Sequence, residues 1–440
     1  MRPVYLALKF VLKYALWIFY PRTRVVNKPK KRFARTIYAS NHAASFMDPL
    51  VVASNQSPIV FFMTRSDVFT TLLKPILWAA HMLPIYRSHD GEDTKIKNEQ
   101  VFRKCSKILK YGRSLLIFSE GFTDDEFIRR LKPIKKGSIR IGFGALESMN
   151  WNKQVFVQAV GVNYSDPNVL GSEVVISNGE PICLNDFKED YLNNPNKVIN
   201  ELTKELEIQM QDQLTHVEKH EWAPFHENIM RLTRKGMSPF DSDKSIPLLK
   251  RWKYSKELAK WMNTNSLENN SQILQLRDEL KDYFQLLQEM QLKESDVHKM
   301  ASRNHSKFLK LIYLVMVLPI TIVGLIHNFP GYYWVKPFVE KSFKRKVFWG
   351  SVKLLLGAFV IGVYNVVLIS CIHLFLIPSF WFWIIYFFCV PPITGVIAYD
   401  YFKNLKEFRR IRKMEKVDLS TIFQKRLDLI KKISDLIPVA

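Results

Sequence analysis

A histidine and an aspartate near residue 45 have the side-chain types of a general base and the group that orients it. His42 directly follows a short apolar run, and Asp48-Pro49 resembles a helix N-cap and first turn. Residues six positions apart do not share a helix face, so a turn would have to bring Asp48 back to the imidazole. A histidine held by a carboxylate can remove a proton from a hydroxyl group near neutral pH. Taken alone, the pair is better explained as a surface histidine beside an ordinary helix cap.

Further polar clusters follow other apolar runs. They are Arg87, Glu120-Gly121 with Lys135-Lys136 downstream, and the segment 160–164 (VGVNY). An arginine at the end of a strand could bind a phosphate group through two parallel hydrogen bonds. Each cluster is weak evidence alone, because arginine after a strand, Glu-Gly in a turn and lysines at the start of a helix are common.

The elements that must position these side chains alternate between strand-like and helix-like patterns. Strand-like runs occupy 36–40, 58–63, 114–119 and 155–162, and helical patterns occupy 95–111 and 137–149. Strands that alternate with helices predict an α/β domain with a mostly parallel sheet flanked by helices. Ligand-binding groups of such sheets gather on loops after the carboxyl ends of strands, where all these clusters would lie.

In this order and spacing, the clusters resemble the sequence blocks of the PlsC-like glycerophospholipid acyltransferase family, over residues 36–165. The family's blocks are a His-(x)4-Asp motif, a block ending in Arg, a Phe-Pro-Glu-Gly block and an apolar-Pro-apolar strand. By this resemblance, His42 would be the general base and Asp48 its orienting partner. The residues that the resemblance implies for acceptor binding are Arg87, Glu120, Gly121, Lys135 and Lys136.

The chain also departs from the family pattern. Five residues rather than four separate His42 from Asp48, Ser119 stands where proline is usual, and the fourth block has Gly161 and no proline. The acidic run 124–126 (DDE) lies close to the expected phosphate site without an evident reason. These departures keep a second interpretation open, in which the chain is a non-catalytic lipid-binding or scaffold membrane protein with a decayed acyltransferase domain.

The resemblance implies an O-acyltransferase of phosphatidic acid and phospholipid synthesis. A fatty acyl group would move from acyl-CoA or acyl carrier protein to glycerol 3-phosphate or 1-acylglycerol 3-phosphate, with no metal or bound cofactor. His42 would take the acceptor's hydroxyl proton and return it to the leaving thiol. The longer His–Asp spacing, the segment 131–137 (LKPIKKG) and the C-terminal apolar region look more like the branch related to eukaryotic microsomal glycerol-3-phosphate acyltransferases. This slightly favours glycerol 3-phosphate as the acceptor.

A net charge of +23 favours an anionic partner, which could be nucleic acid, a membrane surface or a phosphorylated substrate. Twenty of these charges lie in residues 1–36, 328–351 and 401–440, which adjoin apolar segments. The charge therefore predicts contact with membrane lipids. Residues 4–20 contain only two charged residues, both lysines, and predict a helix lying in the membrane interface. A nucleic-acid binder is a distant alternative, because the sequence contains no recognised DNA- or RNA-binding module.

Three long segments are almost uncharged: 309–327, 354–376 and 379–399. The last two are long enough to cross a hydrocarbon core of about 30 Å, so they predict a transmembrane hairpin over 354–399. Pro391-Pro392 is expected to kink or break its second helix. The first segment has Pro319 near its centre and is expected either to span the membrane or to dip in and return. The basic stretches 328–351 and 401–440 predict that both lie on the cytoplasmic side. If the catalytic domain is also cytoplasmic, as we expect, the chain crosses an even number of times, and two crossings fit. Three crossings would place that domain on the opposite face from the tail.

The expected organisation has five parts. They are an interfacial helix and basic collar (1–35), an α/β acyltransferase domain (36–225), a polar helical region (226–307), a membrane region (308–400) and a basic cytoplasmic tail (401–440). Within the polar region, residues 266–292 have apolar residues at spacings of three and four, which predicts a helical arm packed on its own chain. His216 and His220 have a spacing compatible with a metal on one helix face, but no HExxH motif or obvious third ligand accompanies them, so no metal is expected.

Overall fold

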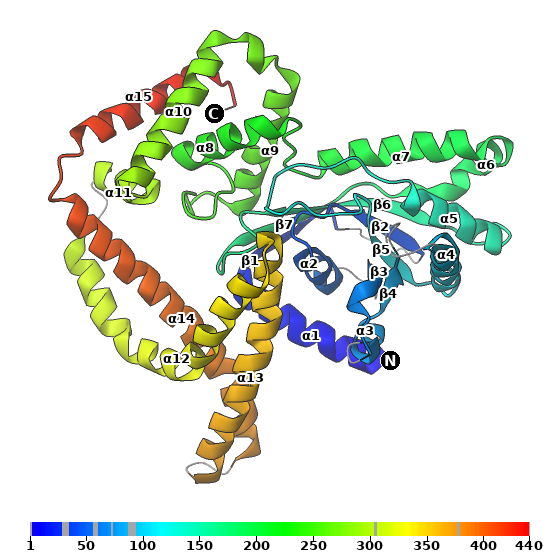
Figure 1. Cartoon of the computed structure of the whole chain (residues 1–440), viewed down its shortest axis with the longest axis horizontal. Helices are drawn as coiled ribbons and strands as arrows, with labels where there is room; N and C mark the ends of the chain where they lie inside the picture. Colours follow the sequence, from blue (N-terminus) through cyan, green and yellow to red (C-terminus); the bar gives the residue numbers. More distant parts are fainter. Residues whose placement is uncertain are drawn as a thin grey trace. The chain divides into compact units, whose positions relative to one another are not determined.

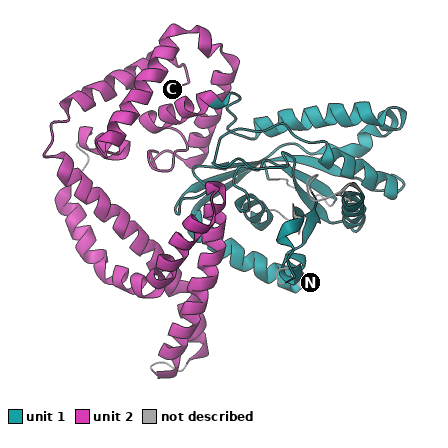
Figure 2. Cartoon of the chain, in the orientation of Figure 1, with its two compact units in different colours: residues 1–220 teal, residues 221–440 magenta. Residues whose placement is uncertain are grey.

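The computed structural model (Figure 1) describes residues 2–28, 35–55, 60–71, 74–86, 94–302, 306–375 and 379–439. The chain divides into two compact units, residues 1–220 and 221–440, which are coloured separately in Figure 2. The first unit contains the β-sheet, and the second is helical in its described residues.

The first unit is built on a mixed sheet, with eight strands among the described residues in the order β1-β7-β6-β2-β5-β3-β4 and with β8 beside β6. The strands are β1 Arg22–Val26, β2 Thr36–Ser40, β3 Val60–Arg65, β4 Met82–Ile85, β5 Ser114–Phe118, β6 Phe156–Tyr164, β7 Glu173–Asn178 and β8 Ile182–Cys183. β2 runs parallel to both β5 and β6, so the carboxyl ends of these three strands lie at the same edge. β7 and β8 run antiparallel to β6, whereas the other pairs are parallel.

Helices cover both faces of this sheet. The helices are α1 Arg2–Phe19, α2 Met47–Asn55, α3 Lys74–Ala79, α4 Thr94–Lys110, α5 Gly137–Ser148, α6 Lys188–Asn193 and α7 Pro195–Asp212. One hydrophobic core joins the sheet to α4, α5 and α7, with Leu115, Leu109, Phe143 and Leu206 fully buried in it. In Figure 1, α1 and α2 lie on the side of the sheet opposite α7.

This architecture agrees with the expected α/β fold of mostly parallel strands flanked by helices, and the four expected strands correspond to β2, β3, β5 and β6. β1 and β7 were not expected. β1 lies inside the stretch interpreted as a basic collar, and its Arg22 guanidinium contacts the buried Glu173 carboxylate of β7 at 3.2 Å. Because β1 pairs with β7, the sheet begins before residue 36. β1 is the edge strand, and its two arginines are exposed while Val25 and Val26 are half-buried.

The polar helices of the second unit include α10, which packs against α8 and α15, and α9, which packs on α8. The helices are α8 Ala223–Thr233, α9 Leu248–Thr264, α10 Ser271–Glu289, α11 Glu294–Ala301 and α15 Ser420–Leu436. α10 buries the expected seam of Ile273, Leu276, Leu280, Tyr283 and Leu287, whereas Met290, expected in the same seam, is 38% exposed. The tail expected at 401–440 is in part a packed helix. α15 buries an apolar face and places Arg426 beside the buried Glu294 at 2.7 Å.

Three helices of this unit are long and apolar enough to cross a membrane: α12 Lys307–Ser342, α13 Trp349–Phe375 and α14 Phe380–Met414. α12 contains three prolines and α14 contains Pro391-Pro392 in its interior. Figure 1 shows both helices changing direction along their length, as interior prolines favour. The helical backbone of α14 continues through its two prolines, so this helix is bent rather than broken.

The bent helix α12 starts and ends at the same end of the α13–α14 hairpin, opposite the connection between α13 and α14. Three contacts define this arrangement: Lys310 Nζ to Glu407 Oε1 at 3.0 Å, Lys353 Nζ to Glu340 Oε1 at 2.6 Å, and Asn328 Nδ2 to the Pro391 carbonyl oxygen at 2.9 Å. The first two join the start and the end of α12 to that end of the hairpin. The third joins the middle of α12 to the interior of α14. Re-entry of the expected segment 309–327 into a membrane stays a prediction.

Candidate active site

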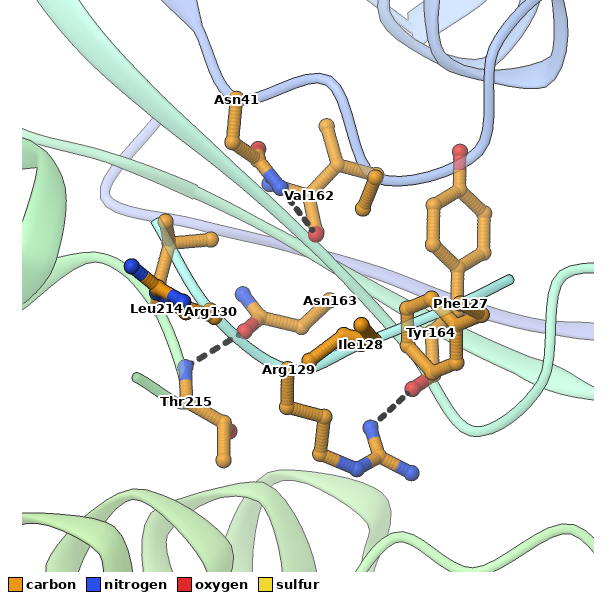
Figure 3. Close-up of a pocket in the computed structure, with 11 residues that line it drawn as sticks. Asn41, Phe127, Ile128, Arg129, Arg130, Val162, Asn163, Tyr164, Leu214 and Thr215 are labelled. Carbon is orange, nitrogen blue, oxygen red and sulfur yellow. Dashed lines mark hydrogen bonds between the residues drawn. The ribbon is translucent and has the colours of Figure 1, made fainter. Parts of the chain in front are cut away.

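The ends of β2, β5 and β6 bring three of the expected clusters to one edge of the sheet. His42 follows β2 by two residues, and its ring stacks on Phe118 at the end of β5, with ring centroids 4.3 Å apart. The Asn41 side chain accepts from the Val162 backbone N–H at 2.8 Å and donates to the Val162 carbonyl oxygen at 3.1 Å, as Figure 3 shows in part. These contacts fix the backbone just before His42 against β6.

His42 and Asp48 meet, with Nδ1 of the imidazole 3.0 Å from Oδ2 of the carboxylate. The turn between them contains Ser45 in a left-handed conformation, with φ of 51°. Backbone bonds from Met47 to Ala44 and from Asp48 to Ser45 close the turn and start α2. The turn thereby accommodates five intervening residues and returns Asp48 to the imidazole.

The pair has the geometry of a base and its orienting group. Asp48 is fully buried, whereas the His42 side chain is 21% exposed. Because Nδ1 donates to the carboxylate, the lone pair of Nε2 is left to accept a proton from a substrate. Asp48 accepts two further hydrogen bonds, from the Ala44 backbone N–H at 2.8 Å and from the Tyr164 hydroxyl at 2.9 Å.

Glu120 supports the same histidine from its backbone side. Its Oε1 accepts from the His42 backbone N–H at 3.2 Å, and its Oε2 lies 3.0 Å from Lys132 Nζ. Burial raises the pKa of the Glu120 carboxyl group, and the Lys132 ammonium group opposes this rise. Lys132 also contacts Asp124 at 3.3 Å, which gives one residue of the acidic run a partner. Acceptor binding by Glu120 stays a prediction, since the contacts it makes here are with His42 and Lys132.

Gly121 and the two predicted lysines lie beside this network. Gly121 has φ of +78°, and a Cβ atom there would lie 2.8 Å from Lys135 Nζ. The Lys135 backbone N–H donates to the Ser119 carbonyl oxygen at 2.8 Å, which holds the exposed lysine next to the end of β5. Lys136 is the N-cap residue of α5, where helix geometry favours anions. Arg87, the remaining predicted site residue, lies outside the described residues.

The fourth block also has a structural explanation. A Cβ atom at Gly161 would lie 2.2 Å from the Gln213 carbonyl oxygen, so glycine permits a close approach of the chain after α7. Figure 3 shows Arg129 donating to the backbone carbonyl of Tyr164, while the Tyr164 ring points away from that guanidinium. Tyr164 contacts Asp48 and Lys132 contacts Glu120, but neither was among the predicted site residues. The position of Tyr164 at the end of an expected strand was the available signal.

His216 has a local structural role. Its Nδ1 accepts from the Leu131 backbone N–H at 3.0 Å, and burial lowers its pKa. Residues 214–219 lie outside helices, so the spacing of His216 and His220 does not place them on one helix face. Among the residues that the structure describes, no group of three or more His, Cys, Asp or Glu side chains could hold a metal ion.

Comparison with protein families gives one match to this unit. Residues 22–160 match the model of the Acyltransferase family, a span that begins at β1 and ends in β6. The chain therefore carries an acyltransferase-type domain, and the matched span contains His42 and Asp48. A comparison with curated proteins found no match.

Proposed function

We propose that the chain is a membrane-bound O-acyltransferase that transfers a fatty acyl group from a thioester donor to a glycerol-3-phosphate-type acceptor. The observation that carries the proposal is the His42–Asp48 contact at 3.0 Å inside the matched domain. The partly exposed imidazole can meet a substrate, while the buried carboxylate holds the orientation of the ring.

In the proposed reaction, Nε2 of His42 takes the proton of the acceptor hydroxyl as the oxygen attacks the thioester carbonyl carbon. Asp48 stabilises the imidazolium that forms. When the tetrahedral intermediate collapses, the C–S bond breaks and His42 returns the proton to the thiolate of the donor, acyl-CoA or acyl carrier protein. General base and acid catalysis of this kind contributes about 10²–10⁴-fold to the rate. This route uses no metal and no bound cofactor.

The phosphate of the acceptor would bind beside Gly121. Lys135 Nζ lies close to this glycine, and Lys136 precedes the N-terminus of α5, so two ammonium groups and free helix N–H groups are available to an anion. Binding by Arg87 stays a prediction. We propose glycerol 3-phosphate rather than 1-acylglycerol 3-phosphate as the preferred acceptor, on the resemblance of the sequence to that branch.

The three apolar helices indicate membrane association. Within the second unit, α15 packs on α10, and Lys432 Nζ lies 2.6 Å from Glu279 Oε1. These elements come before and after the apolar helices, so we propose that they lie on one side of a membrane and that the chain between them crosses an even number of times. We propose that α13 and α14 cross, that α12 enters and returns, and that the flanking basic residues place the polar helices on the cytoplasmic face.

Cysteine labelling tests this topology. Single cysteines replacing Ser306 and Lys344, which precede and follow α12, should react with an impermeant maleimide from the cytoplasmic side of sealed vesicles. A cysteine replacing Ser379, at the start of α14, should react from the opposite side. Labelling of the first two positions from opposite sides would show that α12 crosses, and the proposed path would be wrong.

Activity is tested in purified membranes given labelled glycerol 3-phosphate or 1-acylglycerol 3-phosphate with a long-chain acyl-CoA. The wild type should form the acylated product, and His42→Ala should reduce the rate by at least about 10²-fold. His220→Ala is the matched control, because His220 is exposed and lies outside the site. Equal rates for His42→Ala and the wild type would overturn the mechanism. A wild type that binds lipid but transfers no acyl group to either acceptor would favour the alternative of a decayed, non-catalytic domain.

A further inference from the structure

The carboxylate of Asp48 is held on both of its oxygens. Oδ2 faces His42 and the Ala44 backbone N–H, whereas Oδ1 accepts from the Tyr164 hydroxyl at 2.9 Å. Asp48 and Tyr164 are both fully buried, so solvent cannot replace this bond without entering the core. A hydrogen bond between a neutral donor and a buried carboxylate is stronger than one between neutral groups.

Aromatic and backbone contacts fix the direction of the Tyr164 hydroxyl. The Tyr20 ring, just after α1, packs against the Tyr164 ring with centroids 5.7 Å apart, and Tyr20 donates its own hydroxyl to the Pro167 carbonyl oxygen at 2.7 Å. The Phe127 ring meets Tyr164 edge-on, with centroids 6.3 Å apart and an angle of 89°. Arg129 donates to the backbone carbonyl oxygen of Tyr164 (Figure 3). The Tyr164 ring is thus packed against two separate segments, at Tyr20 and at Phe127.

Burial and the neighbouring Asp48 carboxylate keep this phenol protonated. The titratable groups around the pair and the phenol are Glu120, Lys132 and Tyr20. Asp166 acts on Tyr20, and the Arg129 guanidinium contacts the Tyr164 backbone carbonyl on the side away from the phenol. Burial and the negative charge of Asp48 raise the pKa of Tyr164 well above its ordinary value. Tyr164 therefore remains a donor to Asp48 at every pH at which the enzyme would work.

We propose that Tyr164 is a positioning residue for the transfer reaction, which acts through Asp48 to set the orientation and basicity of His42. The inference rests on the proposed function of the His42–Asp48 pair. The hydrogen bond from the Tyr164 hydroxyl stabilises the negative charge of the Asp48 carboxylate. It also prevents the carboxylate from rotating away from Nδ1 of the imidazole. Without this donor, Oδ1 would be buried without its hydroxyl partner, and the less neutralised carboxylate would bind the imidazolium more strongly.

This role has two measurable consequences for Tyr164→Phe, which keeps the ring and removes the hydroxyl. The kcat of the transfer should fall by about 10–100-fold while KM for both substrates stays close to the wild-type value. The acidic limb of the pH profile of kcat/KM should move to higher pH by about one unit, because the Asp48 carboxylate without its phenolic donor holds the imidazolium more strongly. A merely structural role for the hydroxyl would not move that limb.

Tyr191→Phe is the matched control. Tyr191 also donates its hydroxyl to a carboxylate, Glu147 Oε1 at 3.1 Å, and its ring is also packed in the first unit, against Phe143. Loss of a tyrosine–carboxylate hydrogen bond away from the site should leave kcat and the pH profile within about twofold of the wild type.

A second measurement does not require transferase activity. Diethyl pyrocarbonate modifies unprotonated imidazoles, so the extent of His42 modification against pH, read by peptide mass spectrometry on the full chain in detergent, reports the apparent pKa of His42. The midpoint should rise by about one pH unit in Tyr164→Phe and stay unchanged in Tyr191→Phe. The protection of His216, which depends on the folded domain, should be unchanged in both variants and verifies that they fold.

The outcomes separate the two proposals. An active wild type whose pH profile and His42 midpoint do not move in Tyr164→Phe overturns the positioning role and leaves the proposed function standing. A change in KM alone, or an equal change in Tyr191→Phe, also overturns it. If the wild type transfers no acyl group, the proposed function fails, whereas the midpoint of His42 modification still decides whether Tyr164 acts on the pair.

Discussion

Replacement of Lys132 by methionine tests how the buried ion pair supports the site. The Lys132 side chain is 8% exposed and that of Glu120 is 1% exposed, and their charged atoms are 3.0 Å apart. Lys132→Met removes the ammonium group and leaves the carboxylate buried beside the His42 backbone N–H. Removal of one partner from a buried pair costs about 3–5 kcal/mol. Because Lys132 also contacts the more exposed Asp124, we expect the lower end of this range, about 3 kcal/mol.

The loss should depend on pH. Burial holds the pKa of Glu120 above its ordinary value in the folded chain, and removal of Lys132 raises this pKa further. An acid with a raised pKa favours folding when it is protonated, so the loss in the variant should be largest at pH 8. It should shrink as the pH falls toward the ordinary glutamate value. The double variant Glu120→Gln/Lys132→Met, which has no buried charge, should recover most of the loss at pH 8.

Hydrogen–deuterium exchange with mass spectrometry measures this effect in peptides that cover residues 119–136. At about 1.4 kcal/mol per tenfold change, a loss of about 3 kcal/mol predicts local opening on the order of 10²-fold more frequent at pH 8. Lys110→Met is the control, because Lys110 is exposed at the end of α4. Exchange equal to the wild type at pH 8, or a difference that does not shrink at pH 5.5, would refute the argument from the buried pair.

Three other substitutions test separate parts of the chain. Gly121→Ala should reduce activity, because a left-handed backbone costs alanine about 1–2 kcal/mol and the new Cβ atom would press on the Lys135 side chain. Gly144→Ala should leave activity unchanged, because a Cβ atom there would lie in open space. In melting experiments on the detergent-purified protein, Gly324→Val should lower the midpoint, since a Cβ there would lie 2.2 Å from the Thr394 carbonyl oxygen of α14. Arg426→Met should make α15 more sensitive to limited proteolysis, because the charge of the buried Glu294 would lose its partner. Unchanged cleavage would contradict this.

Much of the fold could be predicted, because buried strands and amphipathic helices leave local patterns in the sequence. The runs that became β2, β5 and β6 are short and apolar, and they alternate with helical segments. β1 could not be recognised in this way, because Arg22 and Arg24 precede its two valines and suggested a basic collar. Its pairing with β7 joins residues some 150 positions apart, such as Arg22 and Glu173. Only the folded sheet reveals that these two segments are neighbours.

In the candidate site too, contacts within one short segment could be predicted, whereas contacts between distant segments could not. The turn that returns Asp48 to His42 could be anticipated, since both residues lie within one short segment. The contact of Tyr164 with Asp48 could not, because it spans 116 positions and depends on how β6 lies beside the start of α2. The pairing of Lys132 with Glu120 likewise depends on the path of the loop between β5 and α5. Side chains that support a site from distant segments leave little signal in a single sequence.

The departures from the family pattern bear on the choice between a working and a decayed domain. The longer spacing between His42 and Asp48 is accommodated by the left-handed Ser45, and the pair still meets at 3.0 Å. Gly161 admits the backbone of Gln213, so its presence has a packing reason in this chain. A domain that had lost its activity would be under no requirement to keep a buried carboxylate that accepts from a partly exposed histidine and from two further donors. The retention of this arrangement despite the altered spacing favours the catalytic interpretation.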